Sequence, residues 1–306
     1  MNIFEKYPRS AFLKGLPDDS EFFPLRERIV ELFRFLDGLE DPHFEQQLDR
    51  DAHARLWEMM LAKILKSEGY ELKSTDHGPD FVIEKDGKRV FIEAICPGPG
   101  DEGNPNSVPP IVYGAPIFQD VPVAQIVLRI RSALEEKKRK YAQYLAQGIV
   151  SEGDICIIAV SSSKIGRASG LWPPLILRAT HGLGNPYVVF APGEGAVEEG
   201  ITECKSIPKV GGHEIDTTFF LSGENGLISA VLYSDCSFFS LGFDLFGESM
   251  LIHNPKAYVP LHTGFLMRIA EIWTIYCHGE SQWRAYRINN AQPMAGGNGT
   301  NAVPQP

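Results

Sequence analysis

The chain has 306 residues, of which 43% are hydrophobic, so it can form one large domain or two ordinary ones around a substantial core. The formal net charge of −10 argues against a protein that coats nucleic acid through bulk charge, although it is compatible with a local basic groove. The five cysteines include no CxxC pair, which argues against a zinc knuckle and a disulfide framework. Without an apolar signal core or a membrane-length apolar stretch, we expect a cytoplasmic protein with no membrane partner.

The first half of the chain predicts helices followed by a hairpin. Residues 1–48 are expected to form an N-terminal helical segment, which includes a helix over residues 24–39. A second helix follows, with Asp49 or Asp51 as its cap and Gly69 at its end. The segment 78–97 then predicts two strands joined by Asp86-Gly87, a preferred two-residue hairpin turn.

The rest of the chain predicts a sheet that later strands extend. A Pro- and Gly-rich connection, of the kind that is often functional, precedes a strong helix ending at Gly148. The later expected elements are a buried strand at 154–163, further strands at 186–192, 217–222, 228–234 and 283–288, and a helix at 263–277. The fold class is therefore α/β: residues 49–289 form one domain with a central mixed sheet flanked by helices, and residues 290–306 form a disordered tail.

The hairpin brings two acids face to face. If the loop is Asp86-Gly87, pairing outward from it places Asp80 opposite Glu93, with Cβ atoms about 5 Å apart. Such like charges are destabilising unless they are compensated, and a divalent cation such as Mg²⁺ compensates carboxylates best. Alternatively, one acid is protonated or both point to solvent. The apolar run VFIEAIC around Glu93 weakens this alternative, because it is typical of a strand covered on both faces.

The preceding helix supplies a third acid. Glu58 has Ala54, Leu61 and Leu65 as its i−4, i+3 and i+7 neighbours, so it lies at the edge of the apolar face. A boundary glutamate that reaches solvent is the alternative interpretation. Together with Asp80 and Glu93, Glu58 makes a set of one helical and two strand acids.

This order of elements resembles the PD-(D/E)XK nuclease superfamily, and also a group of uncharacterised bacterial proteins placed in it. The segment GPDF at 78–81 resembles the PD element, and FIEAI at 91–95 resembles the strand with the second acid. The resemblance implies a restriction-endonuclease-like core with additional C-terminal strands. It also implies metal-dependent phosphodiester hydrolysis of nucleic acid, with DNA as the expected substrate. The metal, Mg²⁺ or Mn²⁺, would be bound by Asp80, Glu93 and the Ala94 carbonyl, with Glu58 holding a metal-bound water or a second ion.

The lysine of the superfamily motif is missing from its usual place. Ile95 stands two residues after Glu93, where the motif has lysine. Lys137 is the expected replacement, because its spacing from the apolar residues Leu134 and Tyr141 lets it face the sheet. There it would orient the nucleophile or stabilise developing negative charge. The alternative is that EEKKRK is a solvated run of ion pairs, and Lys138 is the second candidate.

A local cationic surface is also needed to bind phosphates. Its candidates are Arg129, Arg131, Lys137, Lys138, Arg139, Lys140, Lys164 and Arg167. Ile95 and the acidic net charge favour a second hypothesis, a catalytically degenerate nuclease-fold protein that only binds or assembles. An unrelated hydrolase lacks support, since the chain contains no G-x-S-x-G, HExxH, Walker or G-x-G-x-x-G motif. The oligomeric state is left open, with a homodimer among the options.

Overall fold

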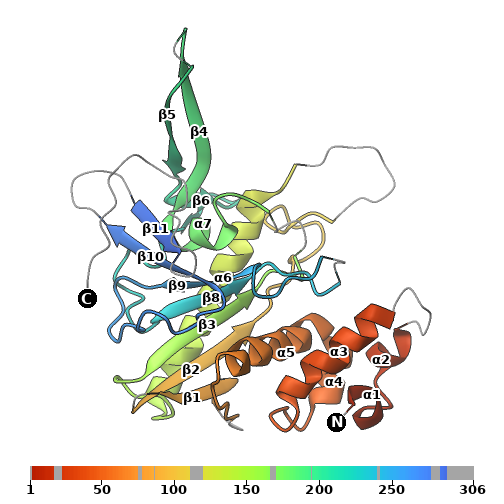
Figure 1. The fold of residues 1–306 in the computed structure, drawn as a ribbon. Helices are drawn as coiled ribbons and strands as arrows, with labels where there is room; N and C mark the ends of the chain where they lie inside the picture. The colour runs from red at the N-terminus through yellow and green to blue at the C-terminus, as the bar shows by residue number, and fades with distance from the viewer. Residues whose placement is uncertain are drawn as a thin grey trace.

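The computed structural model describes residues 2–16, 23–74, 78–85, 87–110, 120–165, 170–193, 195–239, 242–276 and 283–287. Arg167, Asp86 and the expected tail at 290–306 lie outside these ranges. The described part forms an α/β protein in which one large mixed sheet lies between two layers of helices (Figure 1). The expected central mixed sheet flanked by helices is therefore confirmed.

Five helices precede the first strand of the described chain. They are α1 (Ile3–Lys6), α2 (Ala11–Gly15), α3 (Phe23–Leu36), α4 (Phe44–Arg50) and α5 (Ala52–Ser67). The expected boundary at residue 48 falls inside α4, and the apolar side chains of α3 and α4 share one core with α5 and the sheet. Asp51 caps α5, since its carboxylate accepts a hydrogen bond from the Ala54 amide at 3.3 Å.

The sheet has seven strands in the order β1-β2-β3-β8-β9-β10-β11. Its members are β1 (Phe81–Lys85), β2 (Lys88–Ile95), β3 (Ile155–Ser161), β8 (Ala230–Ser234), β9 (Ser249–His253), β10 (Ala270–Tyr276) and β11 (Trp283–Arg287). Strands β2, β3 and β8 are mutually parallel, whereas β1, β9 and β11 each run antiparallel to a neighbour. The expectation that the C-terminal half extends the sheet is confirmed.

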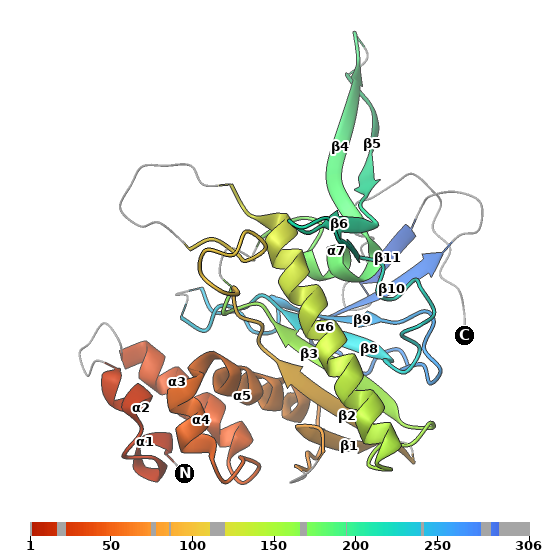
Figure 2. The ribbon, with the colours of Figure 1, turned by 180° about the vertical axis from the view of Figure 1, so that it is seen from behind.

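Side chains alternate between two cores along the first strands. On β2, Val90, Ile92 and Ala94 face the core shared with α5, and Phe91 faces the core on the other side. Helices α6 (Val123–Ala146) and α7 (Leu175–His181) cover that other side, and α6 crosses β2 and β3 (Figure 2). By this alternation, Glu93 lies on the α6 face of the sheet.

A further short pairing precedes β1. Lys73 and Val82 form an isolated antiparallel bridge with reciprocal backbone hydrogen bonds of 3.0 and 2.9 Å. The chain order around β1 is therefore helix α5, this bridge, β1, β2, helix α6 and β3, in which β3 returns parallel to β2.

Two expected elements are wrong. The segment 263–277, expected as a helix, contains turns and then strand β10, which pairs with β9 and β11. The segment 217–222, expected as a strand, consists of turns and irregular backbone. Phe219 and Phe220 are apolar there because they fill the core under α6 and α7, not because they lie on a strand.

Four strands of the described chain stand outside the main sheet. Strands β4 (Leu183–Ala191) and β5 (Gly195–Glu203) form a two-stranded ribbon, and β6 (Ser206–Pro208) pairs with β7 (Glu214–Asp216). Among the residues that the structure describes, none of the helices combines the length and the apolar character required to cross a bilayer.

Candidate active site

The hairpin has the register that the sequence predicts. Phe81 pairs with Ile92, and the pairing runs to Lys85 with Lys88 at the turn. Gly87 has φ of 74°, a backbone conformation that glycine adopts without the steric cost of a side chain. Because this register is fixed, Asp80 and Glu93 lie together at the end of the hairpin away from the turn.

Asp80 is tied to the strand that carries Glu93. Its Oδ2 accepts a hydrogen bond from the Ala94 amide at 2.6 Å. The side chain is half-buried, and burial raises the pKa of Asp80, with the nearby charge of Glu93 adding to the effect. Lys137 and the Ala94 amide act in the opposite direction but do not cancel it. The charge of Glu93 therefore adds to the cost of ionising Asp80.

Glu93 is fully buried and receives two lysines from α6. The Lys137 Nζ donates to Glu93 Oε1 at 2.8 Å, and the Lys140 Nζ donates to the same oxygen. The Tyr144 hydroxyl lies 3.4 Å from Oε2 and 3.0 Å from the Gly78 carbonyl oxygen. A buried carboxylate is costly unless it is paired and hydrogen-bonded, and these contacts supply that compensation.

Helical periodicity explains why these groups converge. Lys137, Lys140, Tyr141 and Tyr144 are spaced by three, four and seven residues, so they lie along one face of α6. Tyr141 anchors this face to the sheet, because its hydroxyl lies 2.8 Å from the carbonyl oxygens of both Phe91 and Ile157. Lys140 was expected only among the phosphate-binding cations, yet it has the same spacing signal as Lys137.

The helical acid Glu58 lies near this group. Its side chain is 11% exposed, and its Oε1 is 2.5 Å from Nη2 of Arg55, one turn earlier on α5. Burial raises the pKa of Glu58 to about 8, and the charge of Asp80 contributes to the increase. Arg55 and Lys137 oppose the shift. The expected edge position of Glu58 thus becomes a buried position that is electrostatically linked to both hairpin acids.

Lysine protonation follows from the same contacts. Burial acts to lower the pKa of Lys140, but the charge and hydrogen bond of Glu93 outweigh it and raise that pKa above its ordinary value. Lys140 therefore stays charged across the physiological pH range. The site combines buried acids with cations supplied by α5 and α6.

The other expected positions lie elsewhere. Lys138 points to Glu135, with a separation of 4.0 Å, and Ile95 packs at the edge of the core on the α6 side. Arg129, Arg131 and Lys164 hold the fold through the Gly98 carbonyl, the Asp216 carbonyl and the Asp51 carboxylate, respectively. Arg139 is exposed and bonds to the Glu135 carbonyl.

Two residues of the site were not anticipated from the sequence. Arg55 precedes Glu58 by three residues on α5, which is the spacing of a helical ion pair. Tyr144 follows Lys137 by seven residues and so shares its helix face. Both residues could have been predicted from helical spacing once Glu58 and Lys137 had been identified as site residues.

Within the described ranges, no cluster of three or more His, Cys, Asp or Glu side chains is arranged to hold a metal ion. Comparisons with protein-family models, with curated proteins and with solved structures found no match for this chain. The functional interpretation consequently depends on the chemistry of its own residues.

Proposed function

We propose that this protein hydrolyses phosphodiester bonds in nucleic acid, with DNA as the expected substrate, through a metal-dependent site of the PD-(D/E)XK type. The observation that carries the proposal is the hydrogen bond of 2.8 Å between Lys137 on α6 and Glu93 on β2. It puts an ammonium group beside the second acid although Ile95 occupies the usual lysine position. In this proposal, a lysine from the helix takes the role of the missing strand lysine.

The order of the elements supports the same proposal. The superfamily core consists of a helix, a three-stranded meander, a second helix and a further strand. Helix α5, β1, β2, α6 and β3 follow that order, and the isolated bridge at Lys73 stands where the first strand of the meander would be. Asp80 stands just before β1 and Glu93 near the end of β2, which are the positions that the two acidic motif residues require.

The donor atoms fit a hard divalent cation. Mg²⁺ prefers oxygen ligands and is usually held by one or two protein carboxylates, while water and substrate phosphate complete its shell. Asp80 and Glu93 supply two carboxylates, with the Ala94 carbonyl as a further donor, so three clustered acids are not needed. Burial raises the pKa of Asp80 and the nearby charge of Glu93 adds to the shift, so a cation bound between the two carboxylates would favour the charged form of Asp80. When bound, Mg²⁺ or Mn²⁺ would lower the pKa of a coordinated water and offset charge on the phosphate.

The side chains around the two acids have distinct tasks in this proposal. Lys137 and Lys140 hold positive charge where a phosphate oxygen would gain negative charge. Glu58, with a pKa of about 8, can hold or move a proton near neutral pH, and Arg55 fixes its carboxylate in position. Tyr144 orients the second oxygen of Glu93.

A specific observation favours the second hypothesis, a degenerate fold that binds or assembles without catalysis. Both lysines already bond to Oε1 of Glu93, so the carboxylate is neutralised without a metal. In a degenerate protein this pairing would be permanent, and no divalent cation would displace it. The two hypotheses therefore differ in one measurable property, which is metal binding.

Calorimetric titration of Mg²⁺ and Mn²⁺ tests the proposal. The wild type is compared with Asp80→Asn and with the control Glu84→Gln, which changes an exposed acid on the same hairpin. We expect metal binding and a raised unfolding temperature in the wild type and the control, and loss of both in Asp80→Asn. Absence of binding in the wild type, with Asp80→Asn more stable, would reject the metal site.

Cleavage assays complete the test. With Mg²⁺ present, single- and double-stranded DNA and RNA are incubated with the wild type, Lys137→Ala and the matched control Lys138→Ala. We expect a loss of at least about 100-fold in rate for Lys137→Ala, the range for a positioned proton-transfer or charge-stabilising group, and none for Lys138→Ala. Equal losses of cleavage rate in both variants would show that Lys137 has no special role. A wild-type protein that binds metal but cleaves none of these substrates would favour the degenerate fold.

A further inference from the structure

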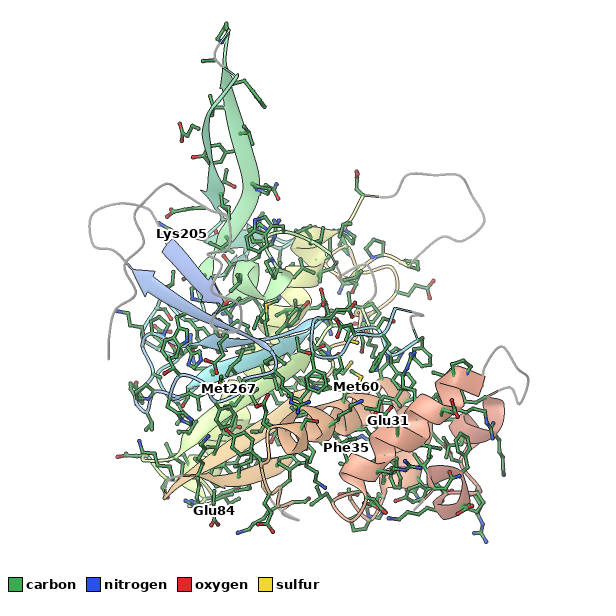
Figure 3. The ribbon with its side chains drawn as sticks, viewed as in Figure 1. Glu31, Phe35, Met60, Glu84, Lys205 and Met267 are labelled. Carbon is green, nitrogen blue, oxygen red and sulfur yellow. The ribbon has the colours of Figure 1, made fainter. Side chains whose placement is uncertain are left out.

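The β4–β5 ribbon, here called the arm, extends away from the rest of the protein. In Figures 1 and 2 the two strands rise above α7 and the main sheet, and they form a sheet separate from it. The pairing of Tyr187 with Gly200 and of Val189 with Glu198 holds the two strands together. Figure 3 shows the side chains of the arm standing out from both sides of the ribbon.

The arm exposes apolar side chains that pack against no core. Tyr187, Val188, Val189 and Phe190 expose 37%, 47%, 44% and 71% of their surface. Successive side chains of a strand point to opposite faces, so both faces of the arm are partly apolar. A cluster of exposed large apolar side chains on one element, unlike a single exposed residue, indicates a surface that another molecule covers.

The charge of the arm limits what can cover it. Residues 183–205 contain four glutamates, namely Glu194, Glu198, Glu199 and Glu203, and one cation, Lys205, whose Nζ lies 2.9 Å from a Glu203 carboxylate oxygen. The arm is therefore net acidic. Phosphate groups would be repelled, so the arm does not fit a nucleic acid backbone or an anionic membrane. Pairing of two arms with each other would bring like charges together, which is unfavourable as well. The partner surface should be apolar and cationic.

The same chain has such a surface beside α3. A groove with a volume of about 770 Å³ is lined by four cationic side chains, Arg26, Arg28, Arg34 and Lys63, against the two acids Glu27 and Glu31. Val30 and Phe243 add apolar surface to it. The Arg28 guanidinium is held in place by a hydrogen bond of 2.7 Å to the Phe238 carbonyl and by its position over the Phe243 ring. The groove thus has the charge and the apolar character that complement the arm.

The arm and the groove lie too far apart to meet within one molecule. In Figure 3, Lys205 marks the base of the arm, and Glu31 marks α3 at the opposite end of the protein. The two ribbon views show the same separation. A contact between these surfaces must therefore join two copies of the chain.

We propose that the arm of one copy docks into the α3 groove of a second copy, and that reciprocal exchange of arms forms a two-fold dimer. The two contacts in such a dimer are equivalent, so the assembly closes and leaves neither surface open. Apolar side chains of the arm cover Val30 and Phe243, while Glu198 faces the arginines of the groove. This inference goes beyond the proposed hydrolysis and does not depend on it.

Sedimentation velocity over a range of protein concentrations tests the dimer. The arm variant combines Val188→Ser with Phe190→Ser, which lie on one face of β4, and the groove variant is Arg34→Glu. Met267→Ser is the control, because Met267 is 58% exposed but lies outside the arm. We expect dimers for the wild type and the control and monomers for the arm and groove variants, all with wild-type circular dichroism. A monomeric wild type, or a dimer that survives either variant, would overturn the proposal.

Mixing experiments separate the arm–groove contact from other causes of dissociation. An equimolar mixture of the arm variant and the groove variant retains one intact arm and one intact groove, so we expect a heterodimer through a single contact. Adding Glu198→Lys to Arg34→Glu exchanges the two charges and should restore self-association in part. If neither the mixture nor the charge exchange restores association, the arm does not bind this groove.

Discussion

Replacement of Lys137 by methionine is the sharpest test of the buried charges. Glu93 is fully buried, and Lys137 is one of two ammonium groups that bond to its Oε1. Removing all partners of a buried ion typically costs about 3–5 kcal/mol, and a single hydrogen bond to a charged group about 1.5–3 kcal/mol. Because Lys140 and Tyr144 still reach Glu93, we expect a loss of about 2–3 kcal/mol in the free energy of unfolding.

The neighbouring lysine gives the matched control. Lys138 lies 4.0 Å from the half-exposed Glu135, so Lys138→Met should cost less than about 1 kcal/mol, as exposed ion pairs do. Urea unfolding at pH 7, followed by circular dichroism, measures both variants. The double variant with Glu93→Gln should recover part of the loss, because the charge that Lys137 compensates is then gone. Equal stability losses for Lys137→Met and Lys138→Met would refute the assigned pairing.

Three further perturbations have signs that follow from the structure. The raised pKa of Glu58, about 8, means that the folded protein binds more protons than the unfolded chain between about pH 4.5 and 8, so stability falls as pH rises through this window. The free energy of unfolding of Glu58→Gln, taken relative to that of the wild type, should therefore be at least about 1 kcal/mol higher at pH 8.5 than at pH 5. The same relative value at both pH values would contradict the shift. Burial acts to raise the pKa of Glu271, but the contact with His253 and hydrogen bonds from two backbone amides lower it overall. Glu271→Gln should therefore cost about 1–3 kcal/mol of unfolding free energy at pH 7, and less as the pH falls below the lowered pKa. A cost that does not change with pH in acid unfolding curves would contradict this assignment. Asp51→Ala removes the acceptor of the Ala54 amide and the ion-pair partner of Lys164, so it should cost about 1–2 kcal/mol in thermal unfolding. Asp51→Asn keeps an oxygen acceptor for the Ala54 amide and loses only the partly exposed ion pair, so it should cost less than about 1 kcal/mol.

The hairpin was predictable because local chemistry determines it. A two-residue Asp-Gly turn fixes the register, and the apolar alternation on both strands agrees with that register. The position of Lys137 was predictable for a similar reason, since one helical period connects it to Leu134 and Tyr141. Metal binding could not be predicted from the sequence, because it depends on the net charge of the site, and the charged side chains of the site come from separate elements of the fold.

The misassigned segments depended on distant parts of the chain. The residues of β10 include a helix-like apolar spacing, but they become a strand because β9 and β11 offer backbone partners on both sides. The arm was recognised in part, since residues 186–192 were expected to form a strand. Its projection from the body was not, because an apolar strand in a sequence looks the same whether a core covers it or not.

Tyr141 fixes the position of α6 along the sheet. Its hydroxyl lies between carbonyl oxygens of two adjacent parallel strands, and it is fully buried on the same helix face as the two lysines. Sliding of α6 along the sheet by one helical turn would break both contacts inside an apolar core. The fold itself thus holds the lysines in register with the acids, so in the proposed hydrolysis their alignment would cost little reorganisation energy.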